Sequence, residues 1–98
     1  MIFSFGNKLA KDLVEENNSK EVKAFPREIY RTARRKLQIV HDAFELQDLK
    51  IPPGNSNRFE KLKGDLKDYY SIRINDQWRV TFKFENHNAY EVAVVDYH

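Results

Sequence analysis

Hydrophobic and polar residues follow two different periods along this chain. Up to Phe44 the apolar residues recur at spacings of three and four, which is the repeat of one face of an α-helix. From Tyr70 onward they recur at every second position, which is the repeat of one face of a β-strand. The pattern predicts that helices occupy the first half of the chain and strands the second half.

The first half is expected to begin with a short strand and a helix. Ile2 to Phe5 is apolar and favours an extended conformation. Asn7 can then cap a helix that carries Leu9 and Leu13 on one face. The polar run Asn17-Asn18-Ser19 predicts the end of this helix.

A second helix is predicted from Pro26, because a residue without an N–H is well tolerated in a first helical turn. Its core-facing stripe is formed by Ile29, Tyr30, Ala33, Leu37, Val40 and Phe44. Its opposite face carries the four cations Arg27, Arg31, Arg34 and Arg35. These arginines form either a solvated outer face or a cationic surface that faces RNA or an acidic protein partner.

Residues 51–57, rich in Pro, Gly and Asn, mark the change from helices to strands. Residues 70–74 and 78–84 predict a hairpin with one apolar face, and a shared polar face that carries Arg73, Arg79 and Lys83. Residues 89–95 predict a last strand, which is apolar on both sides and therefore central or covered on both faces. Residues 57–63 carry a weaker strand pattern.

Composition narrows the class of protein. The 98 residues fit a single domain spanning residues 1–98, and its 41% apolar and 33% charged residues are typical of a globular chain. Cysteine is absent, which excludes disulfides and thiolate metal sites. No stretch has the length of a membrane span or the features of a signal peptide, so a soluble cytoplasmic protein is expected.

The net charge is only +2, so anion binding would have to come from local clustering of cations. Between Asn57 and Lys83 seven basic residues accompany four acidic ones. They are either ordinary decoration of solvent-facing strands or a phosphate-binding surface. Arg73 and Arg79 on adjacent strands favour the second interpretation, since two guanidinium groups can grip one phosphate.

RNA cleavage by its own 2′-OH needs a base, an acid and cations that stabilise the phosphorane. Candidate proton-transfer groups are Glu60, Asp96, Tyr97 and His98, and candidate stabilisers are Arg73 and Arg79. On spacing alone, a terminal Asp-Tyr-His is more often a frayed end than an active site. No metal-ligand spacing, Gly-rich phosphate loop or nucleophile elbow is present, so neither a metal, a cofactor nor a small-molecule substrate is expected.

Four motifs of this chain, in their order and spacing, resemble the HigB-type toxins of the RelE/ParE superfamily of bacterial toxin–antitoxin systems. The motifs are Leu62-Lys63-Gly64-Asp65, Tyr69-Tyr70-Ser71-Ile72-Arg73, Trp78-Arg79-Val80-Thr81-Phe82 and Asp96-Tyr97-His98. The resemblance implies a RelE-like α+β fold with two N-terminal helices packed on a small, twisted, mainly antiparallel sheet. It also implies a ribosome-dependent, metal-independent endoribonuclease that cuts mRNA in the A site and arrests translation.

The same resemblance implies a HigA-like helix-turn-helix antitoxin as partner, beside the ribosome and mRNA. Asp96, Tyr97 and His98 match the family's catalytic ending, and Arg73 and Arg79 match basic positions on its active sheet. The residues expected to contact RNA are the four helical arginines together with Arg58, Lys61, Lys63 and Lys83. In a regular strand Tyr97 would point away from Asp96 and His98. The three side chains could meet one substrate only if the end of the chain bends or bulges, so we expect an irregular C-terminus.

One position departs from the family pattern, because Glu60 stands where relatives often carry a histidine. A carboxylate is a much weaker base than imidazole. The general base is therefore Glu60 or Asp96, or the activity is slow. Two alternatives stay open, namely a ParE-type inhibitor of DNA gyrase without catalytic activity, and an inactive relative that only binds its antitoxin.

Overall fold

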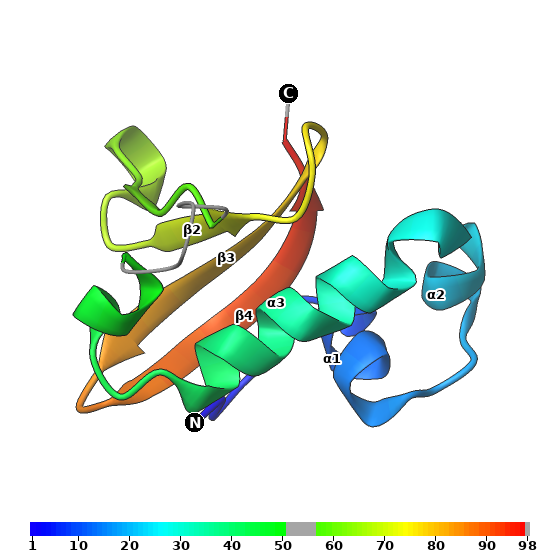
Figure 1. Cartoon of the computed structure of the whole chain (residues 1–98), viewed down its shortest axis with the longest axis horizontal. Coiled ribbons are helices and arrows are strands. Elements are labelled where there is room, and N and C mark those ends of the chain that lie inside the picture. The colour runs from blue at the N-terminus through cyan, green and yellow to red at the C-terminus, as the bar shows by residue number, and fades with distance from the viewer. Residues whose placement is uncertain (51–56, 98) are drawn as a thin grey trace.

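The computed structural model describes residues 1–50 and 57–97, and it shows an antiparallel sheet covered on one face by helices (Figure 1). The sheet has the order β1-β2-β3-β4, with strands Glu60–Lys61, Tyr70–Arg73, Trp78–Glu85 and Asn88–Asp96. The α-helices are α1 (Lys8–Glu15), α2 (Lys20–Ala24) and α3 (Tyr30–Asp42), and the 3₁₀ turns are η1 (Arg27–Ile29), η2 (Leu46–Leu49) and η4 (Gly64–Leu66). The α+β class is confirmed. No helix in these ranges is long and apolar enough to cross a membrane.

The N-terminal helices form largely where their caps predict. The side chain of Asn7 accepts a hydrogen bond from the Ala10 N–H at 3.0 Å and so begins α1. The expected break at residues 17–19 is confirmed, since α1 ends at Glu15, but Ser19 then caps a second helix, α2, that the sequence did not predict. Five residues are too few to display a 3.6-residue period, which is why α2 escaped the pattern.

The long helix begins later and ends earlier than the sequence suggested. Pro26 precedes the turn η1, which contains Arg27, and α3 itself begins at Tyr30. Ala43 adopts an extended conformation and ends the helix, so Phe44 lies beyond it. The prediction that Phe44 belongs to the core is wrong, since its side chain is 61% exposed and stacks on His87 with ring centroids 3.8 Å apart.

The predicted hairpin is confirmed in register, with Ile72 opposite Val80 and Arg73 opposite Arg79. The expected first strand is reduced to two isolated parallel bridges, Ile2 with Ala89 and Phe5 with Val92. Strand β4 therefore lies between β3 and the N-terminal segment, as its doubly apolar sequence predicted. The weak strand expected within residues 57–63 is the two-residue strand β1.

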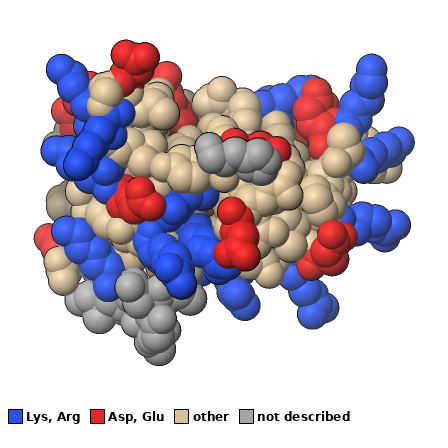
Figure 2. Space-filling view, turned by 90° about the horizontal axis from the view of Figure 1, so that it is seen from above, with Lys and Arg blue, Asp and Glu red and all other residues tan. Residues whose placement is uncertain are grey.

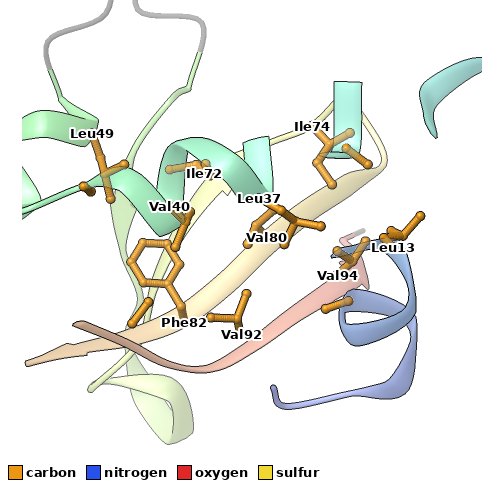
Figure 3. Close-up of a cluster of buried hydrophobic side chains, with 14 of the residues drawn as sticks. Leu13, Leu37, Val40, Leu49, Ile72, Ile74, Val80, Phe82, Val92 and Val94 are labelled. Carbon is orange, nitrogen blue, oxygen red and sulfur yellow. The ribbon is translucent and has the colours of Figure 1, made fainter. Parts of the chain in front are cut away.

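The hydrophobic core lies between α3 and the sheet (Figure 3). Leu37 and Val40 of α3 face the strands, from which Val80, Phe82 and Val92 project toward the helix. Each of these five side chains is at most 1% exposed. Burying a side chain of this size stabilises a fold by roughly 1.5–3 kcal/mol. This packing fixes which face of the sheet is left for polar residues.

Candidate active site

The face of the sheet that points away from α3 carries its polar side chains. Ile72 and Val80 point into the core, so their neighbours Ser71, Arg73 and Arg79 point to the other side. Lys83 follows Arg79 by four positions along β3 and shares its parity. The prediction that Arg73, Arg79 and Lys83 share one polar face agrees with this register.

Arg79 is the centre of this face. Its Nη1 donates to Oε1 of Glu60 at 2.8 Å, and its Nη2 donates to the carbonyl oxygen of Arg58 at 2.5 Å. The ring of Tyr97 lies over the guanidinium, with 5.2 Å between the ring centroid and Cζ. Glu60 reaches this position because β1 pairs with β2, which sets Glu60 opposite Ser71. A cation, a carboxylate and a phenol from three strand regions therefore meet at one point.

Arg73 lies directly opposite Arg79 across β2 and β3, and like charges at this separation need compensation. Asp76 of the hairpin turn compensates the charge of Arg73. Nη2 of Arg73 donates to Oδ1 of Asp76 at 2.6 Å. This hydrogen bond lowers the pKa of the Asp76 carboxyl below its usual value. The two arginines that the sequence singled out are neighbours, but each is oriented by its own acid.

The C-terminal residues divide between the two faces. Tyr97 joins Arg79, whereas Asp96 is registered with Trp78 and accepts a hydrogen bond from Nε2 of Gln77 at 3.0 Å. The expected irregular end is wrong as far as Tyr97, whose N–H still donates to the Gln77 carbonyl at 2.6 Å. The irregularity of β4 lies earlier, where the register with β3 shifts and Glu91 has φ +51°. His98 lies outside the described residues.

The other predicted RNA-contacting residues of the sheet region are mostly exposed. Arg58, Lys61 and Lys63 are exposed, and Figure 2 shows basic side chains gathered over the left-hand part of the molecule, where β1, β2 and η4 lie. Lys83 is more constrained, because its Nζ lies 3.0 Å from Oε2 of Glu91 and 5.2 Å from the ring centroid of Tyr69. The hydrogen bond to Glu91 raises the pKa of Lys83.

The helical arginines form a separate basic surface. Arg31, Arg34 and Arg35 are exposed on the side of α3 that faces away from the core, and Arg27 is exposed in η1. Arg34 forms an ion pair with Glu16, with 2.5 Å between Nη2 and Oε1. These arginines belong to α3 and η1, whereas Arg79 belongs to β3, on the sheet face that points away from α3.

Two buried polar residues beside the site were missed in the sequence. Lys36 of α3 is 3% exposed, and its Nζ donates to Oδ1 of Asn57 at 2.7 Å. A signal for Lys36 was present, because it lies on the same helical stripe as Ala33, Leu37 and Val40.

Among residues 1–50 and 57–97, no group of three or more His, Cys, Asp or Glu side chains could hold a metal ion.

Comparison with known proteins matches this chain to one family along nearly its whole length. Residues 3–98 match the family model described as the RelE-like toxin of type II toxin-antitoxin system HigB. The chain is 39% identical over 84 residues to Toxin HigB-1 of Vibrio cholerae serotype O1, covering 86% of this chain and 84% of that protein. It is 36% identical over 63 residues to Endoribonuclease HigB of Proteus vulgaris, covering 60% of this chain and 68% of that protein.

Solved structures share the fold at lower sequence identity. The YoeB-YefM complex from Staphylococcus aureus contains a chain with a TM-score of 0.58 and 20% identity, covering 100% of this chain and 98% of the other. A YafQ mutant from E. coli also has a TM-score of 0.58, at 9% identity, and covers 98% of this chain and 91% of its own. At these identities the similarity establishes a common fold.

Proposed function

Because the chain belongs to the HigB-like family of RelE-like toxins of type II toxin–antitoxin systems, we propose that it is an endoribonuclease that cleaves mRNA in the ribosomal A site. The single observation that carries this proposal is the contact of Glu60 with Arg79 beneath the ring of Tyr97. A proton acceptor, a phosphate-binding cation and a phenol are thereby within reach of one scissile phosphate. The relative from Proteus vulgaris, named as an endoribonuclease, supports the same class of reaction.

Cleavage would proceed by attack of the substrate's own 2′-hydroxyl. The Glu60 carboxylate removes the 2′-OH proton while the bond between O2′ and phosphorus forms. The bond between phosphorus and O5′ then breaks, and the departing oxygen takes up a proton. The products are an RNA end with a 2′,3′-cyclic phosphate and an RNA end with a 5′-hydroxyl. No external reactant is consumed in this step.

Arg79 would stabilise the phosphorane, whose equatorial oxygens carry more negative charge than the ground-state phosphate. Glu60 occupies Nη1 of Arg79, so an incoming phosphate oxygen can take the place of the carboxylate on that donor. Arg73, directly opposite and 31% exposed, would contact the neighbouring part of the RNA backbone. Once the phosphate replaces it, the Glu60 carboxylate is available to accept the proton.

The proton donor to the leaving oxygen would be Tyr97 or His98. Tyr97 lies against Arg79, which makes its hydroxyl the favoured donor among the described residues. Asp96 is turned toward Gln77 and Trp78, so its role would be to hold the end of β4. Glu60 is for the same reason a better candidate for the general base than Asp96.

The family membership provides an antitoxin partner, and we propose that it is of the HigA-like helix-turn-helix type. The exposed helical arginines Arg31 and Arg35 would contact ribosomal RNA, while the sheet residues Arg58, Lys61 and Lys63 would follow the mRNA backbone. Since the ribosome and its mRNA are the proposed targets, the proposed site of action is the cytoplasm. Contacts of this kind do not depend on RNA sequence.

The test is incubation of the purified protein with a defined mRNA, with and without ribosomes programmed by that mRNA. Cleavage that needs ribosomes and leaves 5′-hydroxyl ends is the expected result. Cleavage of free RNA would show that the reaction does not need the ribosome. Absence of cleavage together with inhibition of DNA supercoiling by gyrase would replace the proposal with the ParE-type activity.

A further inference from the structure

The segment from Asn57 to Glu60 connects the helical core to Arg79. On its inner side, Oδ1 of Asn57 accepts from Nζ of Lys36 at 2.7 Å, and its backbone oxygen accepts from the Arg73 N–H at 2.6 Å. On its outer side, the Arg58 carbonyl and the Glu60 carboxylate hold the two terminal nitrogens of Arg79. Both hydrogen-bond partners of the Arg79 guanidinium therefore lie in a segment that is itself hydrogen-bonded to α3.

Lys36 is an unexpected residue at its position in α3. Its neighbours on the same stripe, Ala33, Leu37 and Val40, are apolar and at most 1% exposed. A lysine buried to 3% exposure is unfavourable unless its ammonium group is hydrogen-bonded. Its Nζ reaches Asn57, which is equally buried. Filling the core does not require an ammonium group, so the hydrogen bond to Asn57 is the feature that distinguishes Lys36 from an apolar residue at this place.

The backbone of the same segment is strained. Arg58 has φ +42°, a left-handed conformation that residues other than glycine rarely adopt. Such a conformation persists where surrounding contacts enforce it, and it is concentrated at functional sites. Here it lies between the Asn57 carbonyl that binds Arg73 and the Arg58 carbonyl that binds Arg79. Contacts on both sides of the strained residue keep its carbonyl directed at the guanidinium.

We propose that Lys36 and Asn57 are positioning residues for RNA cleavage, because they hold the Asn57–Glu60 segment in the conformation that orients Arg79 and Glu60. This inference rests on the proposed function for the reaction, but the geometric claim stands on the contacts alone. Lys36 acts through Asn57 and touches no substrate. A displacement of about 1 Å in a reacting group lowers rates by about 100-fold.

The test measures ribosome-dependent mRNA cleavage for the full chain, with kcat and KM determined separately. Lys36→Met and Asn57→Ala each remove the buried hydrogen bond, and each is expected to lower kcat about 100-fold with little change in KM. Asn57→Asp keeps an oxygen that accepts from the Lys36 ammonium, so its kcat should stay close to that of the wild type. Leu13→Ala, a buried change on α1, controls for a general loss of stability and should leave kcat unchanged.

A variant that lacks both groups oriented by the segment, Glu60→Gln with Arg79→Ala, shows whether Lys36 acts through them. Adding Lys36→Met to that double variant should not lower its residual rate further, because neither the carboxylate nor the guanidinium is left to orient. An additional 100-fold loss would overturn the proposal. So would wild-type kcat in folded Lys36→Met or folded Asn57→Ala, and either variant decides the question if the other does not fold.

A readout independent of catalysis separates this proposal from the proposed function. The Nε atom of Arg79 is buried, so its N–H signal in the NMR spectrum should exchange slowly with water. In Lys36→Met and Asn57→Ala this exchange is expected to accelerate at least tenfold, whether or not the protein cleaves RNA. Unchanged exchange in both variants would overturn the positioning role. Absence of cleavage by the wild type, with the accelerated exchange in the variants, would overturn the reaction alone.

Discussion

The carboxylate of Glu60 lies 2.8 Å from the guanidinium of Arg79, yet the two side chains differ widely in exposure. Arg79 is 9% exposed and Glu60 is 48% exposed. The guanidinium of Arg79 is thus buried, while the carboxylate of Glu60 is in contact with solvent. In the proposed site, a phosphate approaching from solvent would replace the carboxylate and leave the arginine in place.

Glu60 is predicted to be the general base, and Glu60→Gln tests this role. The amide keeps the shape of the side chain but does not accept a proton, so the cleavage rate should fall by about 10²–10⁴. Glu60→His should retain more activity than Glu60→Gln, since an imidazole accepts a proton. Single-turnover cleavage by the three proteins is the measurement. Equal rates for wild type and Glu60→Gln would assign the base to another group.

The corrected position of Phe44 leads to a prediction about stability. Leu37 and Phe44 belong to the same apolar stripe in the sequence, but Leu37 is 1% exposed and Phe44 is 61% exposed. Leu37→Ala should therefore lower the free energy of unfolding by about 2–5 kcal/mol. Phe44→Ala should lower it by about 1 kcal/mol or less, through the loss of its stack on His87. Urea titrations of both variants decide between the two positions.

The residue that ends α1 adopts a conformation suited to glycine. Glu16 has φ +60°, and its side chain makes an ion pair with Arg34. Glu16→Gly and Glu16→Ala both remove that ion pair, but only glycine relieves the backbone strain. Glu16→Gly is expected to be about 1 kcal/mol more stable than Glu16→Ala. Equal unfolding midpoints for the two variants would show that the left-handed conformation is not populated.

The stability of the fold depends on pH through the carboxyl group of Asp12. Its side chain is 2% exposed, and hydrogen bonds from Lys8, Ser19 and Asn17 hold the pKa of its carboxyl far below the usual value. A depressed pKa in the folded state stabilises the protein above the unfolded-state pKa, which is about 4. This contribution decreases as the pH falls below that value toward the folded-state pKa.

Asp12→Asn should accordingly be less stable than the wild type at pH 7, and the difference should shrink between about pH 4 and pH 2. Thermal unfolding at a series of pH values measures it. Asp65→Asn serves as the matched control, because Asp65 is exposed and the change should have little effect at any pH. A difference for Asp12→Asn that stays constant with pH would contradict the linkage.

Local signals in the sequence were sufficient for much of this fold. The side chain of Asn7 predicted the start of α1, and strand parity predicted that Arg73 and Arg79 share a face. These features depend on neighbouring residues, which a pattern can display. The short helix α2 and the end of α3 at Asp42 were not predicted. Five residues are too few to display a helical period, and the end of α3 depends on the conformation of Ala43.

The sequence named Glu60, Arg79 and Tyr97 as candidates but did not predict the contacts between them. Glu60 and Arg79 are 19 residues apart, and the pairing of β2 with both β1 and β3 brings them together. Lys36 was missed because its role depends on Asn57, which is 21 residues away. Asp96 was grouped with Tyr97 by the family resemblance of the chain's ending, and strand parity already indicated that their side chains point apart, as the structure shows. Contacts of this kind arise from tertiary packing.

Arg79 is the residue on which the account depends, and its replacement is the most direct test. The measurement is cleavage of a defined mRNA on programmed ribosomes by the wild type, by Arg79→Ala and by Lys11→Ala, which removes one exposed cation from α1. Arg79→Ala is expected to remain folded and to lose about 10²–10³ in rate, while Lys11→Ala is expected to cleave like the wild type. A folded Arg79→Ala variant with the wild-type rate would contradict an active site centred on Arg79.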